Sequence, residues 1–186
     1  MELIQQFDVT VLFFIRDRLH ADWLNPVMTS VSFLANWGII WIAVAAALLC
    51  LRKYRKTGAE LILALVFCLV AMSCLKAFFL RDRPFIDYPQ AALLIPPPRS
   101  ASFPSGHAMS SFASASVLFS ANRKAGAAAF ALAALIAFSR LYLFVHYPTD
   151  VLAGIVLGFA AAKSAGYLVK RFSRTPSGKR KTRQGE

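Results

Sequence analysis

Hydrophobic positions gather into long continuous stretches along this chain, and short polar segments separate them. A helix needs about 20 mostly apolar residues to cross the hydrocarbon core of a bilayer. Five stretches reach or approach this length, and we predict membrane spans over residues 25–51, 59–80, 105–121, 126–143 and 150–169. The pattern therefore predicts an all-α fold, a polytopic membrane helix bundle with five transmembrane helices.

The N-terminal segment 3–19 follows a different pattern. Its continuous apolar core covers only residues 9–15, and charged residues flank this core on both sides. A core of this length is too short to cross a bilayer. We expect an N-terminal helix that lies in the membrane interface, and a sixth span is the alternative.

The composition supports a membrane protein with one domain. Of the 186 residues, 58% are hydrophobic, and the mean hydropathy of +0.55 is too high for an ordinary soluble domain. We predict a single membrane-embedded domain over residues 1–171. Residues 172–186 are polar and rich in Lys and Arg, which favours a disordered cytoplasmic tail.

The net charge of +12 raises the question of a nucleic-acid partner. The basic residues, however, do not form one continuous face, which argues against binding to nucleic acid. They cluster after the first, third and fifth predicted spans, at residues 52–56, 123–124 and 170–183. Because basic loops stay in the cytoplasm, we expect a multi-pass protein of the cell membrane whose C-terminus is cytoplasmic. The opposite end of the bundle would then face away from the cytoplasm.

Three short motifs carry polar chemistry at that opposite end. In the first, Lys76 and Arg83 are seven residues apart, which places them on one face of a helix two turns long. Pro84 should end this helix and leave the Arg83 guanidinium at the membrane surface. Two cations on one face attract an anion, and the planar fork of Arg suits phosphate. The alternative is a pair of basic side chains that reach from a helix end to the interface.

The second motif is Pro104-Ser105-Gly106-His107, at the start of the third predicted span. Ser105 is a good N-cap, and the free backbone N–H groups behind it can bind an anion. Gly106 would let a ligand approach the backbone closely, and His107 would stand over that ligand with a proton to give. An ordinary capped helix start is the alternative.

The third motif combines His146 and Asp150 around Pro148, a favoured first residue of a helix. Asp150 would lie in the first turn of the fifth span, from where its carboxylate could reach back to the imidazole and stabilise a positive charge on it. Arg140 supplies a third cation. The alternative is a capped helix beside interfacial tyrosines.

The three motifs together favour phosphoryl transfer. This reaction depends mostly on positioning and on neutralising the charge of the phosphate oxygens. Lys76, Arg83 and Arg140 can provide that neutralisation without a metal ion, and no cluster of carboxylates and histidines in the sequence is typical of a two-metal site. We therefore expect neither a metal nor another cofactor.

In this order and spacing, the motifs resemble the type 2 phosphatidic acid phosphatase superfamily of membrane lipid phosphate phosphatases. The resemblance covers residues 76–150 and extends through the helical layout to the fifth span. It implies that His146 is the nucleophile, that Asp150 orients it, and that His107 is the general acid. It also implies that the phosphate is held by Lys76, Arg83, Ser105, Gly106 and Arg140, while Ser139 has a less certain role.

The substrate implied by the resemblance is a lipid phosphate or diphosphate within the bilayer. The short chain and outward-facing site look most like small bacterial undecaprenyl diphosphate phosphatases, and a phosphatidylglycerophosphate or phosphatidic acid phosphatase is the alternative. Two other classes stay open: an anion-binding protein or transporter without catalysis, and a haloperoxidase-like protein. The sequence predicts no oligomeric state.

Overall fold

The structure is a computed structural model that describes residues 2–173. Within these residues every regular element is helical, in agreement with the predicted all-α fold. The α-helices are α1 (Glu2–Leu19), α2 (Asn25–Leu34), α3 (Ile39–Cys50), α4 (Arg55–Phe79), α5 (Pro84–Asp87), α6 (Gly106–Ala121), α7 (Arg123–Tyr142) and α8 (Pro148–Ser173). Two 3-10 helices, η1 (Asn36–Gly38) and η2 (Arg52–Tyr54), join α2 to α3 and α3 to α4.

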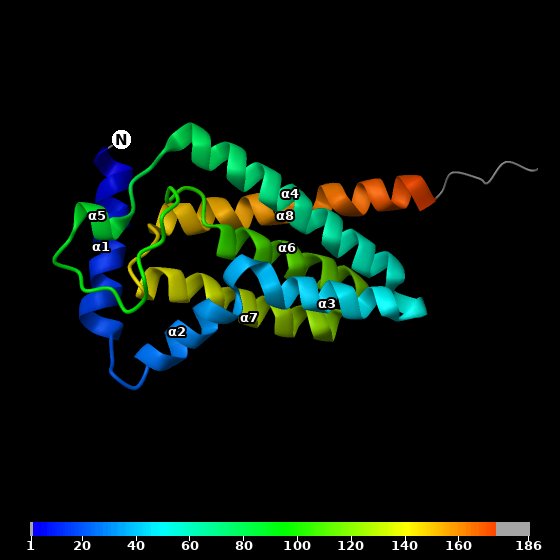
Figure 1. Cartoon of the computed structure of the whole chain (residues 1–186), viewed down its shortest axis with the longest axis horizontal. Coiled ribbons are helices and arrows are strands. Elements are labelled where there is room, and N and C mark those ends of the chain that lie inside the picture. The colour runs from blue at the N-terminus through cyan, green and yellow to red at the C-terminus, as the bar shows by residue number, and fades with distance from the viewer. Residues whose placement is uncertain (1, 174–186) are drawn as a thin grey trace, which may run out of the picture.

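The long helices α3, α4, α6, α7 and α8 run side by side along the long axis of the molecule (Figure 1). α6 packs against α4, α7 and α8 and is therefore the central helix. Small side chains fill much of the interior, because the cluster between α3, α4, α6 and α8 is built around Ala45, Ala64, Ala113 and Ala165. Helices in membranes approach one another closely through such small residues.

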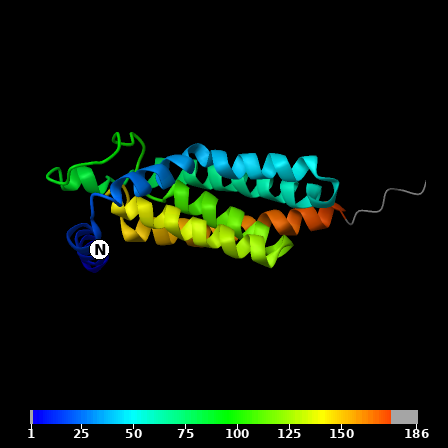
Figure 2. The same ribbon diagram turned by 90° about the horizontal axis from the view of Figure 1, so that it is seen from below.

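α1 lies across one end of this bundle rather than along its axis, as Figure 1 and Figure 2 show from two sides. Leu12 and Ile15 are buried against the loop 143–147 between α7 and α8. Other apolar residues of α1, such as Leu3 and Phe14, are exposed. A helix placed in this way would follow a membrane surface, and its interfacial position stays a prediction.

The first predicted span is not one continuous helix. The structure divides it into α2 and α3, which are bent by 43° relative to each other. At the break, Trp37 and Gly38 have φ angles of 56° and 69°, which an α-helix does not accommodate. The predicted span over 25–51 is therefore a broken helix, because left-handed backbone at these two positions interrupts a run that is apolar on both sides.

The number of spans is settled only in part. Among the described residues, three stretches are long and apolar enough to cross a membrane, namely Arg52–Asp87, Arg123–Tyr142 and Pro148–Ser173, and the bent pair of α2 and α3 adds a fourth. α6 has 16 residues, fewer than the about 20 that a span requires. The count of five therefore remains a prediction.

The ends of the bundle differ in charge. The turns at residues 52–56 and 123–124 and the end of α8 lie at the end opposite α1 (Figure 1). α8 continues to Ser173, two residues beyond the predicted domain boundary, and the rest of the predicted tail lies outside the described residues. Within the described residues, the basic blocks and the three motifs therefore occupy opposite ends of the molecule, as the sequence indicates.

Candidate active site

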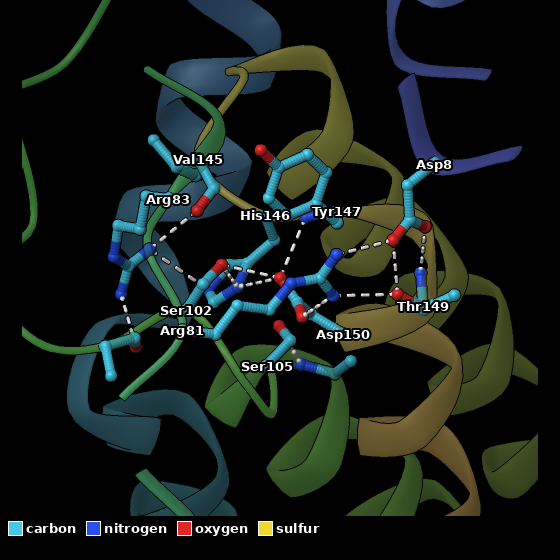
Figure 3. A network of polar contacts seen from close by, with 12 residues as sticks. Asp8, Arg81, Arg83, Ser102, Ser105, Val145, His146, Tyr147, Thr149 and Asp150 are labelled. Carbon is cyan, nitrogen blue, oxygen red and sulfur yellow. Dashed lines mark hydrogen bonds and ion pairs between the residues drawn. The ribbon is translucent and has the colours of Figure 1, made fainter. Parts of the chain in front are cut away.

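The predicted site residues meet at the end of the bundle that α1 crosses. They come from the end of α4 and the segment behind it, the first turn of α6, the end of α7, and the loop 143–147 with the first turn of α8. Figure 3 shows the polar contacts around Arg83, His146 and Asp150.

His146 and Asp150 are in contact, as predicted. α8 begins at Pro148 and brings the Asp150 carboxylate back toward the loop, where its Oδ2 lies 3.5 Å from His146 Nδ1. Both side chains are buried. The local cause is the rigid proline start of the helix, which fixes the residue two positions later in the first turn.

Ser102 completes this pair, and the sequence analysis missed it. Its hydroxyl donates to Asp150 Oδ2 at 2.5 Å and lies 3.4 Å from His146 Nδ1. The backbone N–H of Tyr147 donates to the same carboxylate oxygen at 2.9 Å. Ser102 belongs to the irregular segment between α5 and α6, where only its nearness to the Pro104 motif could have drawn attention to it.

These contacts assign the tautomer of His146. Arg83 Nη1 lies 3.3 Å from the other ring nitrogen, Nε2, and a guanidinium can only donate. Nε2 therefore accepts, and the proton lies on Nδ1, beside Asp150 and Ser102. His146 lies between the membrane-spanning segments of α7 and α8, and burial lowers its pKa to about 3, so that the imidazole is neutral at physiological pH. The lone pair of Nε2 thus points toward the arginine and accepts from it.

Arg83 and Lys76 converge, although not in the predicted way. α4 ends at Phe79, and Arg83 lies beyond it in extended backbone, so the argument from two helical turns is wrong for Arg83. Leu80 ends the helix with a φ angle of 46°. Both cationic side chains nevertheless turn toward Ser100: Arg83 Nε donates to its carbonyl oxygen at 2.7 Å, and Lys76 Nζ to its hydroxyl at 3.3 Å.

Arg140 is the third cation and comes from the last turn of α7. One terminal nitrogen donates to Ser32 Oγ in α2, while its buried Nε has no partner within the described residues. Arg140 lies within electrostatic range of Arg83 and of Lys76. Like charges gathered in a buried place are unfavourable unless an anion lies between them. The arrangement is therefore suited to an anion such as phosphate.

His107 stands in the first turn of α6, near the same cations. It lies near enough to His146, Arg140 and Arg83 to interact with their charges. Its Nε2 is 3.1 Å from Asn36 Oδ1, at the break between α2 and α3. Asn36 was not predicted as a site residue, because the pattern of the sequence did not indicate the break between α2 and α3 in which it lies.

The other predicted positions have mainly structural contacts. Ser105 caps α6 by accepting from the N–H of Ala108 at 3.5 Å, as predicted. A methyl group at Gly106 would lie 2.4 Å from Met72 Sδ, so close packing of α4 on α6 is one reason for a glycine there. The buried Ser139 hydroxyl donates to the carbonyl of Ile136 at 2.7 Å and stays within α7.

One basic residue near the site did not enter the sequence analysis. Arg81 forms ion pairs with Asp150 and with Asp8 of α1, each at 2.7 Å. Pairing over such a distance in sequence leaves no local pattern. Among residues 2–173, no group of three or more His, Cys, Asp or Glu side chains could hold a metal ion.

Comparison with known proteins gives the family. The sequence model described as "PAP2 superfamily" matches residues 57–174. The chain is 35% identical to an undecaprenyl-diphosphatase of Sulfolobus acidocaldarius over 138 residues, which are 73% of this chain and 66% of that protein. It is 33% identical to phosphatidylglycerophosphatase B of Bacillus subtilis over 166 residues, 81% of this chain and 79% of that protein.

Solved structures agree with this assignment. The crystal structure of Aquifex aeolicus LpxE superimposes with a TM-score of 0.77 at 28% identity and covers 86% of this chain and 94% of that one. A phosphatidylglycerolphosphate phosphatase of the PAP2 type from Bacillus subtilis gives a TM-score of 0.75 at 25% identity, over 95% of this chain and 90% of that one. The resemblance of the three motifs is thereby confirmed, and the chain belongs to the PAP2 superfamily of membrane phosphatases.

Proposed function

We propose that the protein hydrolyses a lipid phosphate or diphosphate through a phosphohistidine at His146. The observation that carries the proposal is that each ring nitrogen of His146 has a charged side chain beside it. Nδ1 faces the buried Asp150 carboxylate, and Nε2 faces the guanidinium of Arg83. A buried, neutral imidazole with its lone pair directed at an anion-binding group is a nucleophile in position.

In the first step, the lone pair of His146 Nε2 attacks the phosphorus, and the bond from phosphorus to the leaving oxygen breaks. The imidazole becomes positively charged, and Asp150 stabilises this charge through the proton that stays on Nδ1. Lys76, Arg83 and Arg140 neutralise the phosphate oxygens, and the N-terminus of α6 behind Ser105 and Gly106 adds backbone donors.

The leaving oxygen takes a proton from His107, which acts as general acid. In the second step, water attacks the phosphohistidine and gives a proton back to His107, while the electron pair of the broken P–N bond returns to Nε2. Inorganic phosphate leaves, and both histidines regain their starting states. No metal ion takes part in this scheme.

We place the site at the extracytoplasmic face, because the basic blocks lie at the other end of the bundle. The favoured substrate is undecaprenyl diphosphate, in view of the Sulfolobus relative of that name. Phosphatidylglycerophosphate is the second candidate, because a sequence relative and a structural neighbour carry that activity in their names.

The test is a substrate panel with the purified protein in detergent. Undecaprenyl diphosphate, phosphatidylglycerophosphate and phosphatidic acid are supplied in turn, and released phosphate is measured with and without excess EDTA. We expect release that survives EDTA and is fastest with undecaprenyl diphosphate. His146→Ala should abolish turnover, because it removes the nitrogen that attacks the phosphorus.

Two results would contradict the proposal. A strict requirement for added Mg²⁺ would mean that a metal ion, and not Lys76, Arg83 and Arg140, neutralises the phosphate oxygens. Full turnover by the His146→Ala protein would exclude the phosphohistidine. An anion carrier without catalysis would bind phosphate in both proteins and release none from any lipid.

A further inference from the structure

Asp150 is held on both of its oxygens, and only one of them faces the histidine. Oδ2 accepts from Ser102 and Tyr147 and contacts His146, whereas Oδ1 accepts from Arg81 Nη1 at 2.7 Å. Arg81 also fixes Ser102, because its carbonyl oxygen accepts from the Ser102 N–H at 2.8 Å. Arg81 therefore contacts one oxygen of the Asp150 carboxylate directly and holds Ser102, which contacts the other.

The four terminal donors of Arg81 are all occupied within the protein. Nη1 donates to Asp150 Oδ1 and, at 2.8 Å, to Thr149 Oγ1, while Nη2 donates to Asp8 Oδ2 at 2.7 Å and to Gln5 Oε1 at 3.2 Å. The guanidinium also lies over the ring of Tyr147, 4.2 Å from its centroid. An arginine whose terminal N–H groups are all hydrogen-bonded within the protein cannot bind a phosphate through two hydrogen bonds. Arg81 is thus distinct from the three phosphate-binding cations.

Asp8 ties this arginine to α1. The Asp8 side chain is fully buried, although it lies on the helix that crosses the end of the bundle. Its Oδ1 accepts from the N–H of Thr149 at 2.8 Å, and its Oδ2 accepts from Thr149 Oγ1 at 2.5 Å in addition to Arg81. A carboxylate buried from solvent is costly unless such partners compensate it. Figure 3 shows this row of contacts from Asp8 to His146.

We propose that Asp8 and Arg81 are positioning residues for the reaction, and that α1 completes the active site through them. This inference rests on the proposed function. Asp8 holds the guanidinium against Asp150 and shares its positive charge, so that Asp150 keeps enough negative charge to stabilise the imidazolium of His146. α1 lies outside residues 57–174, the part that matches the family. The contribution of Asp8 therefore comes from a segment that the shared motifs do not include.

The test compares Asp8→Asn, Arg81→Ala and the double variant with the wild type in lipid phosphate turnover. Asp8→Asn keeps the shape and an acceptor for the Thr149 N–H but removes the charge. We expect kcat to fall by about 10-fold to 100-fold in each single variant, the cost of a slightly misplaced catalytic group. KM and inhibition by inorganic phosphate should stay within about twofold, because neither residue binds the phosphate.

The double variant separates positioning from a merely structural role. If Asp8 acts through Arg81, Asp8→Asn should have little further effect in the Arg81→Ala protein, since residues of one network are not additive. Full additivity would overturn the inference, as would a raised KM in Arg81→Ala. Asp17→Asn, an exposed carboxylate on the same helix, is the matched control and should leave kcat unchanged.

Arg81→Lys covers the case in which Arg81→Ala does not fold. One ammonium group cannot bind two carboxylates as the guanidinium of Arg81 does. We therefore expect the kcat of Arg81→Lys to lie between that of the wild type and that of the double variant Asp8→Asn with Arg81→Lys. A wild-type kcat in Arg81→Lys would count against the inference. A wild-type protein that releases no phosphate from any lipid would instead refute the proposed function itself.

Discussion

His146 differs from a solvent-exposed histidine in the charge that it carries at acid pH. Burial lowers its pKa from 6.5 to about 3 in the ligand-free protein, and nearby Arg83 acts in the same direction against Asp150. The neutral form, which the proposed mechanism requires, therefore persists over a pH range in which an exposed imidazole would be protonated.

We predict that His146 stays neutral at pH 5, where an imidazole with a pKa of about 6.5 is mostly protonated. NMR of histidine-labelled protein in detergent checks this, because ring shifts report the charge and His146→Ala assigns the signal. The unfolded chain takes up a proton at residue 146 below pH 6.5, whereas the folded chain does so only near pH 3. The free energy of unfolding should therefore fall across this window as the pH is lowered. An imidazolium spectrum at pH 5 would contradict the assignment.

The role of His107 makes a prediction that depends on the leaving group. A lipid alcohol leaves as a strongly basic alkoxide unless it is protonated, whereas a lipid phosphate is a much weaker base. His107→Ala should thus lower kcat by about 100-fold or more on phosphatidic acid, and by a smaller factor on undecaprenyl diphosphate. Inhibition by inorganic phosphate serves as the control for binding and should change little. Equal losses on both substrates would argue against a general acid.

At the scale of elements, the contact between α6 and α8 sets the distance between the two histidine-bearing segments. A methyl group at Gly154 of α8 would lie 2.6 Å from the carbonyl oxygen of Ser105, which is backbone and cannot turn aside. One turn earlier, the N–H of Ser105 donates to the Asp150 carbonyl at 3.0 Å. The absence of a side chain at Gly154 therefore lets the turn at Ser105 lie directly against the helix of Asp150.

We predict that Gly154→Ala separates these helices, lowers stability by about 1–3 kcal/mol as overpacking does, and reduces turnover. Thermal unfolding in detergent and phosphate release measure the two effects. Gly166→Ala is the matched control on the same helix, because a methyl group there would meet the flexible Glu60 carboxylate at 2.7 Å. Equal loss of activity in both variants would show that the site does not depend on this contact.

Local signals in the sequence predicted the parts of the site that one segment builds by itself. The Ser105 cap, the Pro148 start of α8 and the contact between Asp150 and His146 each arise within a few residues. The break between α2 and α3 could not be read in the same way, because a single Trp37-Gly38 pair inside an apolar run is compatible with a continuous helix.

Contacts between distant segments could not be predicted from the sequence, for a different reason. Arg81 meets Asp8 across 73 positions and Ser102 meets Asp150 across 48. In the sequence, each of these residues looks like an ordinary charged or polar residue. Only the docking of α1 and of the segment between α5 and α6 onto the bundle gives them their partners.

For the whole molecule, the separation of charge along the bundle predicts its orientation in the membrane. The candidate site lies at the end that α1 crosses, and the basic turns at residues 52–56 and 123–124 and the end of α8 lie at the other (Figure 1). Since basic loops remain in the cytoplasm, the segment between α5 and α6 should be accessible from outside the cell. Exposed Cys50, at the end of α3, should be accessible only from inside.

This orientation can be measured with a membrane-impermeant thiol reagent on intact cells. Cys68→Ala with Cys74→Ala leaves Cys50 as one thiol, and adding Cys50→Ala with Arg99→Cys leaves one thiol on the exposed segment between α5 and α6 instead. We expect residue 99 to react in intact cells and Cys50 to react only after lysis, each scored in a protein that carries one thiol alone. The reverse pattern would place the site in the cytoplasm. An enzyme of that orientation would meet its lipid in the inner leaflet. The proposal that it acts on undecaprenyl diphosphate at the extracytoplasmic face would then have to be abandoned.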